Sequence, residues 1–81
     1  MGSKLKVLSG KDVVSILNSF DFSIFKQKRS HIKVKRTSRN GVEILIVPNH
    51  TQIAKGTLKS IFNQASKYIS TKELYPHFYT E

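Results

Sequence analysis

Apolar residues near the start of the chain recur with the period of an α-helix. Four of them follow the i, i+3, i+4, i+7 spacing of a single helical face: Val13, Ile16, Leu17 and Phe20. Ser9 precedes them, with Asp12 three residues further on, which is the pattern of a capping box at a helix N-terminus. The sequence therefore predicts a helix over about residues 10–19, followed by a turn at Asp21.

The middle of the chain has the shorter apolar period of β-strands. Residues 22–26 begin one strand, which either ends there or continues through a bend toward Arg29. A second strand is predicted over residues 30–36 and a third over residues 42–47. The polar segment 37–41 between them ends in Asn-Gly, a strong hairpin signal.

A second apolar stripe with helical spacing follows the strands. It is predicted to begin at Gly56-Thr57, and its members are Leu58, Ile61, Phe62, Ala65 and either Tyr68 or Ile69. Ser70 and Glu73 form another capping-box pattern, which predicts a short third helix that Pro76 breaks. Residues 76–81 are expected to form a loose tail.

This order of elements predicts an α+β fold in one domain. A helix, three antiparallel strands, a helix and a short C-terminal helix suit a sheet with both main helices on one face and the other face open. We expect a single domain over residues 1–81, with its core over about residues 5–75. The length of 81 residues is close to the lower size at which a chain can bury a sufficient core unaided.

The stretch from Gln27 to Arg36 concentrates positive charge on the open face of this predicted sheet. Read as one strand, it places four alternate side chains in a row: Arg29, His31, Lys33 and Lys35. Ile32 and Val34 then point the other way, into the core. A histidine within a row of cations indicates a surface that binds a polyanion.

Charge and composition narrow the class of partner. Fourteen Lys and Arg against five Asp and Glu give a formal net charge of +9, so we expect an anionic partner. Nucleic acid is the leading candidate, while an anionic membrane, an acidic protein or a merely soluble basic surface stay open. The chain has no cysteine, which fits a cytoplasmic setting, and no apolar run approaches the roughly 20 residues that span a membrane.

His31 is the leading candidate for proton chemistry. Its imidazole can exchange a proton near neutral pH, and the neighbouring cations favour the neutral form that a general base requires. His50 is interpreted as a turn or capping residue, and His77 as part of the exposed tail. The sequence contains no cluster of metal ligands, no nucleophilic triad and no phosphate-binding glycine loop, so neither metal nor cofactor is expected.

RNA cleavage needs few catalytic groups, because the 2′-hydroxyl of RNA is an internal nucleophile. One histidine with several cations could move the protons and stabilise negative charge on the phosphate. The same residues could instead bind RNA without cleaving it, or form a solvated face that protects a sheet from aggregation. The residues alone leave binding and cleavage nearly balanced.

Four short motifs, in order, resemble those of the HicA toxin family: Val7–Val13, Lys26–His31, Val47–His50 and Lys55–Ile61. The resemblance covers about residues 5–75. It implies a double-stranded-RNA-binding-domain-like fold and a type II toxin that arrests translation by cleaving mRNA. It places the catalytic histidine at His31 and requires no metal or cofactor. It also implies a HicB-type antitoxin that covers this histidine, with oligomers formed only through the antitoxin complex.

The residues expected to bind RNA surround His31, and they are Lys28, Arg29, Ser30, Lys33 and Lys35. Lys28 has the opposite strand parity and is the least secure of them. Arg29 departs from the family, which usually has glycine there, and glycine tolerates backbone angles that arginine does not. Two further hypotheses therefore stay open: a non-catalytic RNA-binding module, and a remnant that Arg29 has inactivated.

Overall fold

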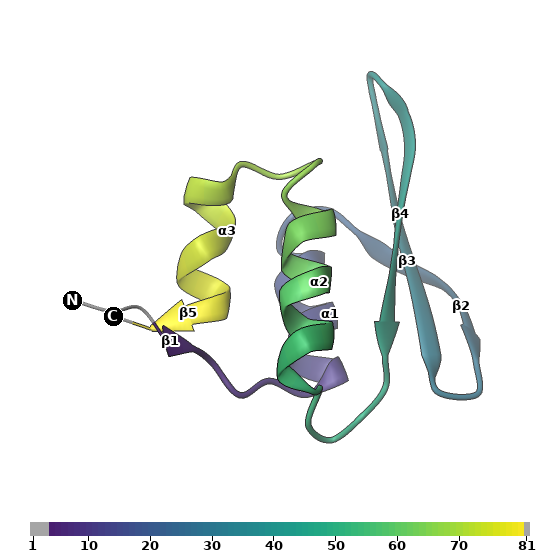
Figure 1. Ribbon diagram of the computed structural model, residues 1–81. Coiled ribbons are helices and arrows are strands. Elements are labelled where there is room, and N and C mark those ends of the chain that lie inside the picture. The colour runs from purple at the N-terminus through teal and green to yellow at the C-terminus, as the bar shows by residue number, and fades with distance from the viewer. Residues whose placement is uncertain (1–3, 81) are drawn as a thin grey trace.

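A three-stranded antiparallel sheet in the order β2-β3-β4 carries helices on one face only (Figure 1). The structure is a computed structural model and describes residues 4–80. Its elements, in chain order, are β1 (Lys4–Leu5), α1 (Gly10–Asn18), β2 (Ser23–Lys28), β3 (His31–Ser38), β4 (Gly41–Pro48), α2 (Lys55–Ala65), α3 (Thr71–Phe78) and β5 (Tyr79–Thr80). The predicted α+β order, a double-stranded-RNA-binding-domain-like layout, is confirmed.

Helix α1 begins with the capping box that the sequence predicts. The backbone N–H of Asp12 donates to Ser9 Oγ over 3.0 Å, and the backbone N–H of Ser9 donates to Asp12 Oδ2 over 2.9 Å. Each bond satisfies a backbone donor that has no partner within the helix. The turn after the helix is at Asp21, which takes a left-handed φ of +73°.

The capping box makes part of the stability depend on pH. The hydrogen bonds from Ser9 lower the pKa of the Asp12 carboxyl below its ordinary value. A lowered folded-state pKa means that the carboxylate contributes stability at neutral pH and loses this contribution as the pH falls below about 4. Asp12→Asn should therefore lower the urea midpoint slightly at pH 7 and by less at pH 2. An equal loss at both pH values would contradict the electrostatic origin.

Strands β3 and β4 form a regular hairpin whose inner side chains enter the core. Ile32 pairs with Val47 and Val34 with Leu45, and all four are buried. The hairpin tip extends beyond the helices (Figure 1). Gly41, the first residue of β4, has a φ of +114°, which favours glycine and accounts for the Asn-Gly signal.

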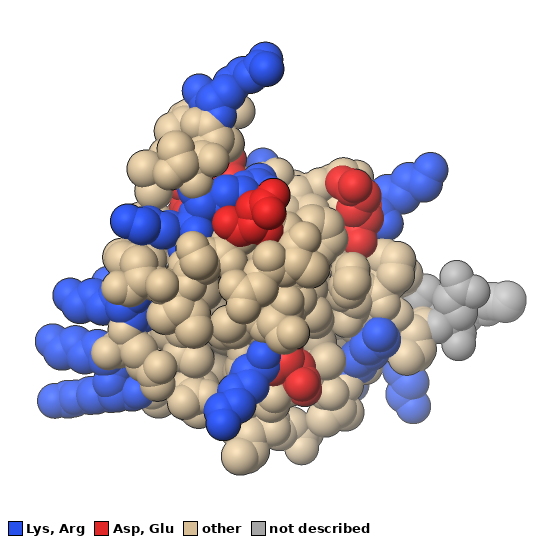
Figure 2. Space-filling view, turned by 180° about the vertical axis from the view of Figure 1, so that it is seen from behind, with Lys and Arg blue, Asp and Glu red and all other residues tan. Residues whose placement is uncertain are grey.

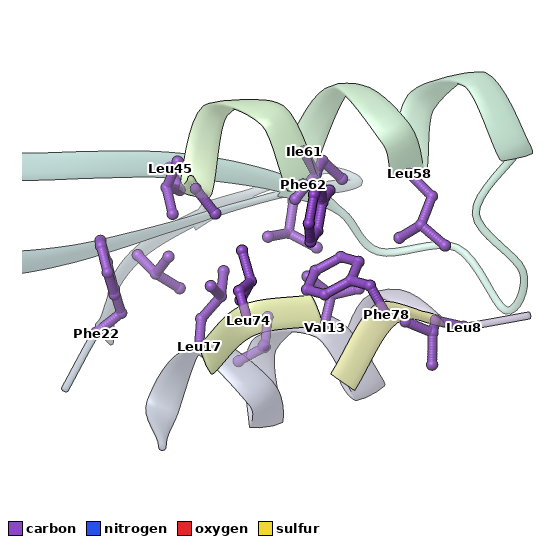
Figure 3. Close-up of a cluster of buried hydrophobic side chains, with 14 of the residues drawn as sticks. Leu8, Val13, Leu17, Phe22, Leu45, Leu58, Ile61, Phe62, Leu74 and Phe78 are labelled. Atoms are coloured by element: carbon purple, nitrogen blue, oxygen red, sulfur yellow. The ribbon is translucent and has the colours of Figure 1, made fainter. Parts of the chain in front are cut away.

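The core lies between the inner face of the sheet and the three helices (Figure 3). Helices α1 and α2 contact the sheet, and α3 lies on the side of these helices away from it (Figure 1). The stripe predicted for α2 is buried over Leu58, Ile61, Phe62 and Ala65. It is continued by Ile69, which is 4% exposed, and not by Tyr68, which is 38% exposed. No helix among residues 4–80 is long and apolar enough to cross a membrane.

The C-terminal region differs from the prediction. Helix α3 continues through Pro76 to Phe78, and β5 pairs with β1, so the expected helix break and the loose tail are wrong for the residues described up to Thr80. Phe78 is fully buried and meets the Phe62 ring edge-on at 5.3 Å, which anchors the helix end. Ser70 precedes α3, but its side chain makes no capping bond, so the second predicted capping box does not form.

Arg36 joins the sheet to the ends of both main helices. Its guanidinium donates to Glu43 Oε1 over 2.8 Å, to the carbonyl of Phe20 over 2.9 Å and to the carbonyl of Tyr68 over 2.9 Å. It also lies 4.8 Å from the centroid of the Phe22 ring. Although it lies within the basic stretch, this charge is engaged on the helical side of the sheet.

Candidate nucleic-acid interface

The basic stretch is a hairpin and not one continuous strand. Lys28 pairs directly with His31, so Arg29 and Ser30 form the turn between β2 and β3. The predicted row is therefore wrong at Arg29. Arg29 takes a left-handed φ of +56°, because a two-residue reversal favours positive φ. This is the backbone conformation for which glycine is suited.

The remaining members of the row lie as predicted. His31, Lys33 and Lys35 alternate along β3 with the buried Ile32 and Val34, so they share the face away from the helices, here called the outer face. Both His31 and Lys35 are exposed, and Lys33 is half-buried.

A β-bulge brings two further lysines to the outer face. The pairing of β2 with β3 shifts between Ile24 and Lys26, so that Lys26 lies opposite Lys33 and Lys28 opposite His31. If the same residues paired regularly, with no bulge at Phe25, both lysines would point toward the helices. Lys28, the least secure residue of the sequence prediction, is thus a direct neighbour of His31. Lys26 was missed, because counting alternation along the chain cannot locate a bulge.

An open concavity of about 500 Å³ lies over these residues and is here called the cationic groove. Its lining consists of Lys26, Lys28, Arg29, His31, Lys33 and Ile46. None of the lining residues is acidic, so their charges add. Figure 2 shows Lys and Arg side chains projecting in a row from the side of the molecule that the sheet forms. Such a groove attracts a polyanion and is suited to stabilising negative charge on a phosphate.

Aromatic and aliphatic side chains adjoin the cations on the outer face. Phe25 is 41% exposed at the bulge, and Lys35 Nζ lies 4.9 Å from its ring centroid. Val42, Ile44 and Ile46 line the outer side of β4, and all three are exposed. Because β4 is an edge strand, this apolar strip lies beside an unpaired backbone edge. The apolar run at residues 42–47 predicts a strand but does not by itself mark a site.

A second concavity of about 360 Å³ adjoins the first and is here called the histidine groove. It is lined by His31, Ile46, Pro48, His50, Ala54, Thr57, Ser60, Ile61 and Gln64. His31 therefore lines both grooves. His50, which the sequence suggested to be only a turn or capping residue, faces the same space as His31. His77 lies elsewhere, on α3, where its ring meets Phe20 edge-on at 5.4 Å.

Ser30 has a structural contact in the turn. It is half-buried, and its carbonyl oxygen accepts the backbone N–H of Asn49 over 2.6 Å.

Within residues 4–80, no three side chains of the His, Cys, Asp or Glu type lie close enough together to hold a metal ion.

The fold and the basic open face define a small α+β domain of the double-stranded-RNA-binding-domain-like layout. A family model described as the HicA toxin of bacterial toxin–antitoxin systems matches residues 10–66, more than half of the chain, and the protein belongs to this family. Membership implies an antitoxin partner. Neither a search of curated proteins nor a search of solved structures finds a match.

Proposed function

We propose that this toxin is a ribonuclease that cleaves mRNA in the cytoplasm and thereby arrests translation. The observation that carries the proposal is the position of His31. It lies on the open sheet face within the cationic groove, directly opposite Lys28 and two residues from Lys33. A titratable ring among cations on an exposed face can reach both the phosphate and the adjacent 2′-hydroxyl of RNA.

In the proposed reaction, His31 takes the proton from the 2′-hydroxyl as this oxygen attacks the phosphorus. Lys28, Arg29 and Lys33 stabilise the negative charge that develops on the phosphate oxygens. Lys35 lies further along β3 and binds a neighbouring phosphate. Ser30 lies beside Arg29 in the turn and is proposed to contact the RNA as well.

We further propose that a HicB-type antitoxin neutralises the toxin by covering His31. The charge of the cationic groove calls for an acidic partner surface. The strip of Val42, Ile44 and Ile46 beside the groove supplies apolar area that a protein partner can bury. In this proposal the toxin enters oligomers only through the antitoxin complex.

The proposal is tested by incubating the purified protein with an RNA oligonucleotide and with DNA of the same sequence. We expect the RNA to be cut and the DNA to stay intact, because DNA lacks the 2′-hydroxyl nucleophile. EDTA should leave the rate unchanged, since no proposed step uses a metal. Inhibition by EDTA would overturn the metal-free mechanism. Salt-dependent RNA binding without cleavage would indicate the non-catalytic binding module instead.

Replacing Arg29 with glycine should raise stability and weaken RNA binding. Arg29→Gly should raise the free energy of unfolding by about 1 kcal/mol, because it relieves a left-handed conformation that an L side chain disfavours. It should also weaken RNA binding and lower the slope of log affinity against log salt by about 1, since one phosphate contact is lost.

Arg29→Lys is the matched control, since it keeps the charge and the backbone strain. It should change neither the unfolding free energy nor the salt slope appreciably. Urea denaturation and fluorescence anisotropy over a series of salt concentrations measure the two effects. Faster cleavage by Arg29→Gly than by the unaltered protein would support the hypothesis that Arg29 inactivates the site.

A further inference from the structure

Backbone contacts hold the segment that carries His50 against the segment that carries His31. The N–H of Asn49 donates to the carbonyl of Ser30 over 2.6 Å, which ties the residue before His50 to the residue before His31. Pro48 is also paired with His31 across β3 and β4. The two histidines thus lie on segments that are joined directly, and both line the histidine groove.

The first turn of α1 supports the same loop from the other side. The N–H of Gly10 donates to the carbonyl of His50 over 2.8 Å. A Cβ at position 10 would come within 2.8 Å of Asn49 Cα and even closer to the carbonyl oxygen of Pro48, so only glycine allows this approach. Three of the motifs noted in the sequence therefore meet at His50: the start of α1, the β2–β3 turn and the end of β4.

Cleavage through the 2′-hydroxyl requires two proton transfers. One proton leaves the attacking oxygen, and another must reach the 5′-oxygen, because an unprotonated alkoxide is a poor leaving group. Each positioned proton donor or acceptor contributes about 10²–10⁴-fold to the rate. His31 cannot accept the first proton and donate the second at the same moment.

We infer that His50 is the general acid of this reaction, an assignment that rests on the proposed ribonuclease function. As the bond between the 2′-oxygen and phosphorus forms, the bond from phosphorus to the 5′-oxygen breaks, and this oxygen takes a proton from the His50 imidazolium. The products are a 2′,3′-cyclic phosphate and a 5′-hydroxyl end. His31 ends protonated and His50 neutral, and exchange with solvent restores both.

The ordinary acidity of an imidazole favours His50 over the lysines as the donor. In general an imidazole titrates near pH 6.5 and a lysine ammonium near 10.4, so an imidazole is better matched to proton transfer at neutral pH. The titratable or charged side chains that line the concavities around His50 are His31 from β3 and Lys11 from α1. Helix α2 faces it with Thr57, Ser60 and Gln64, which do not titrate.

The test uses two RNA substrates that differ only in their leaving group. One is an ordinary oligonucleotide, and the other has sulfur in place of the 5′-bridging oxygen, so that its thiolate departs without protonation. His50→Gln should lower kcat/KM about 10²-fold on the first substrate and change it little on the second. It should also abolish the fall in rate at alkaline pH that deprotonation of the acid causes in the unaltered protein.

Controls separate this inference from the proposed function. His77→Gln, a histidine change on α3, should cleave both substrates at the unaltered rate. If the unaltered protein cleaves RNA and His50→Gln cleaves it equally well, the acid assignment is overturned and the ribonuclease proposal stands. An equal loss on both substrates also overturns it, since His50 would then only position the RNA. If the unaltered protein cleaves neither substrate, both the function and the inference fail.

Discussion

Replacing His31 with alanine is expected to reduce RNA cleavage by about 10²–10⁴-fold while RNA binding is kept. The loss has the magnitude of a removed general acid or base. Binding should persist because the four cations that line the cationic groove with His31 are unchanged: Lys26, Lys28, Arg29 and Lys33. A selective loss of cleavage would separate the ribonuclease from a binding module that uses the same face.

Cleavage is measured on a labelled oligonucleotide, and binding by anisotropy on a 2′-O-methyl version that cannot be cut. Because His31 is exposed and makes no core contact, His31→Ala should unfold at the same urea concentration as the unaltered protein. In cells, its expression should no longer arrest growth. Retained cleavage by this variant would refute the assigned role of His31, whatever the other histidines do.

The sequence was sufficient for the parts of the fold that depend on local periodicity. Helix α1, its capping box and the buried stripe of α2 follow from the spacing of apolar residues and from Ser9 and Asp12. The open outer face could be predicted as well, because Ile32 and Val34 alternate with charged neighbours along β3. These features are set by residues within a few positions of one another.

Features that depend on distant partners were not predicted. The bulge at Phe25 is defined only by the register of β2 against β3, and it decides that Lys26 and Lys28 join His31. The end of α3 is held by burial of Phe78, which outweighs the lost hydrogen bond at Pro76. His50 reaches the histidine groove because Gly10, forty positions away, packs against its loop.

A turn at position 29 has a local signal in the sequence comparison with the family. The glycine usual in the family indicates a positive φ, and a positive φ within a polar stretch indicates a turn. A turn at this position divides the basic stretch at residues 29–30. Lys28 then lies opposite His31, as the structure has it.

Arg36→Ala is expected to cause the largest loss of stability, about 3 kcal/mol. Arg36 and Glu43 side chains are only 20% and 10% exposed, so removing the guanidinium leaves the carboxylate of Glu43 without its counter-charge. Ser38 Oγ, which donates to Glu43 Oε2 over 2.9 Å, compensates only in part. The carbonyls of Phe20 and Tyr68 also lose their donors.

Two further variants identify why Arg36→Ala loses stability. Arg36→Lys keeps the charge but lacks the planar fork that reaches three acceptors at once, so it should lose less, about 1–2 kcal/mol. Arg39→Ala removes the same charge at the exposed hairpin tip and should leave the urea midpoint unchanged, because Arg39 lies outside the core. If Arg36→Ala matched Arg39→Ala in stability, the proposed link between sheet and helices would be refuted.

The same variants test which arginine of the basic stretch stabilises the fold and which contacts RNA. Arg36 is engaged on the helical side of the sheet, so Arg36→Ala, measured where it is still folded, should bind RNA with an unchanged salt slope, whereas Arg29→Gly lowers that slope. Seven positions apart in the same stretch, one arginine then stabilises the fold and the other contacts the phosphate. This division follows from the turn at residues 29–30, which places Arg29 at the edge of the groove and leaves Arg36 in register with Glu43.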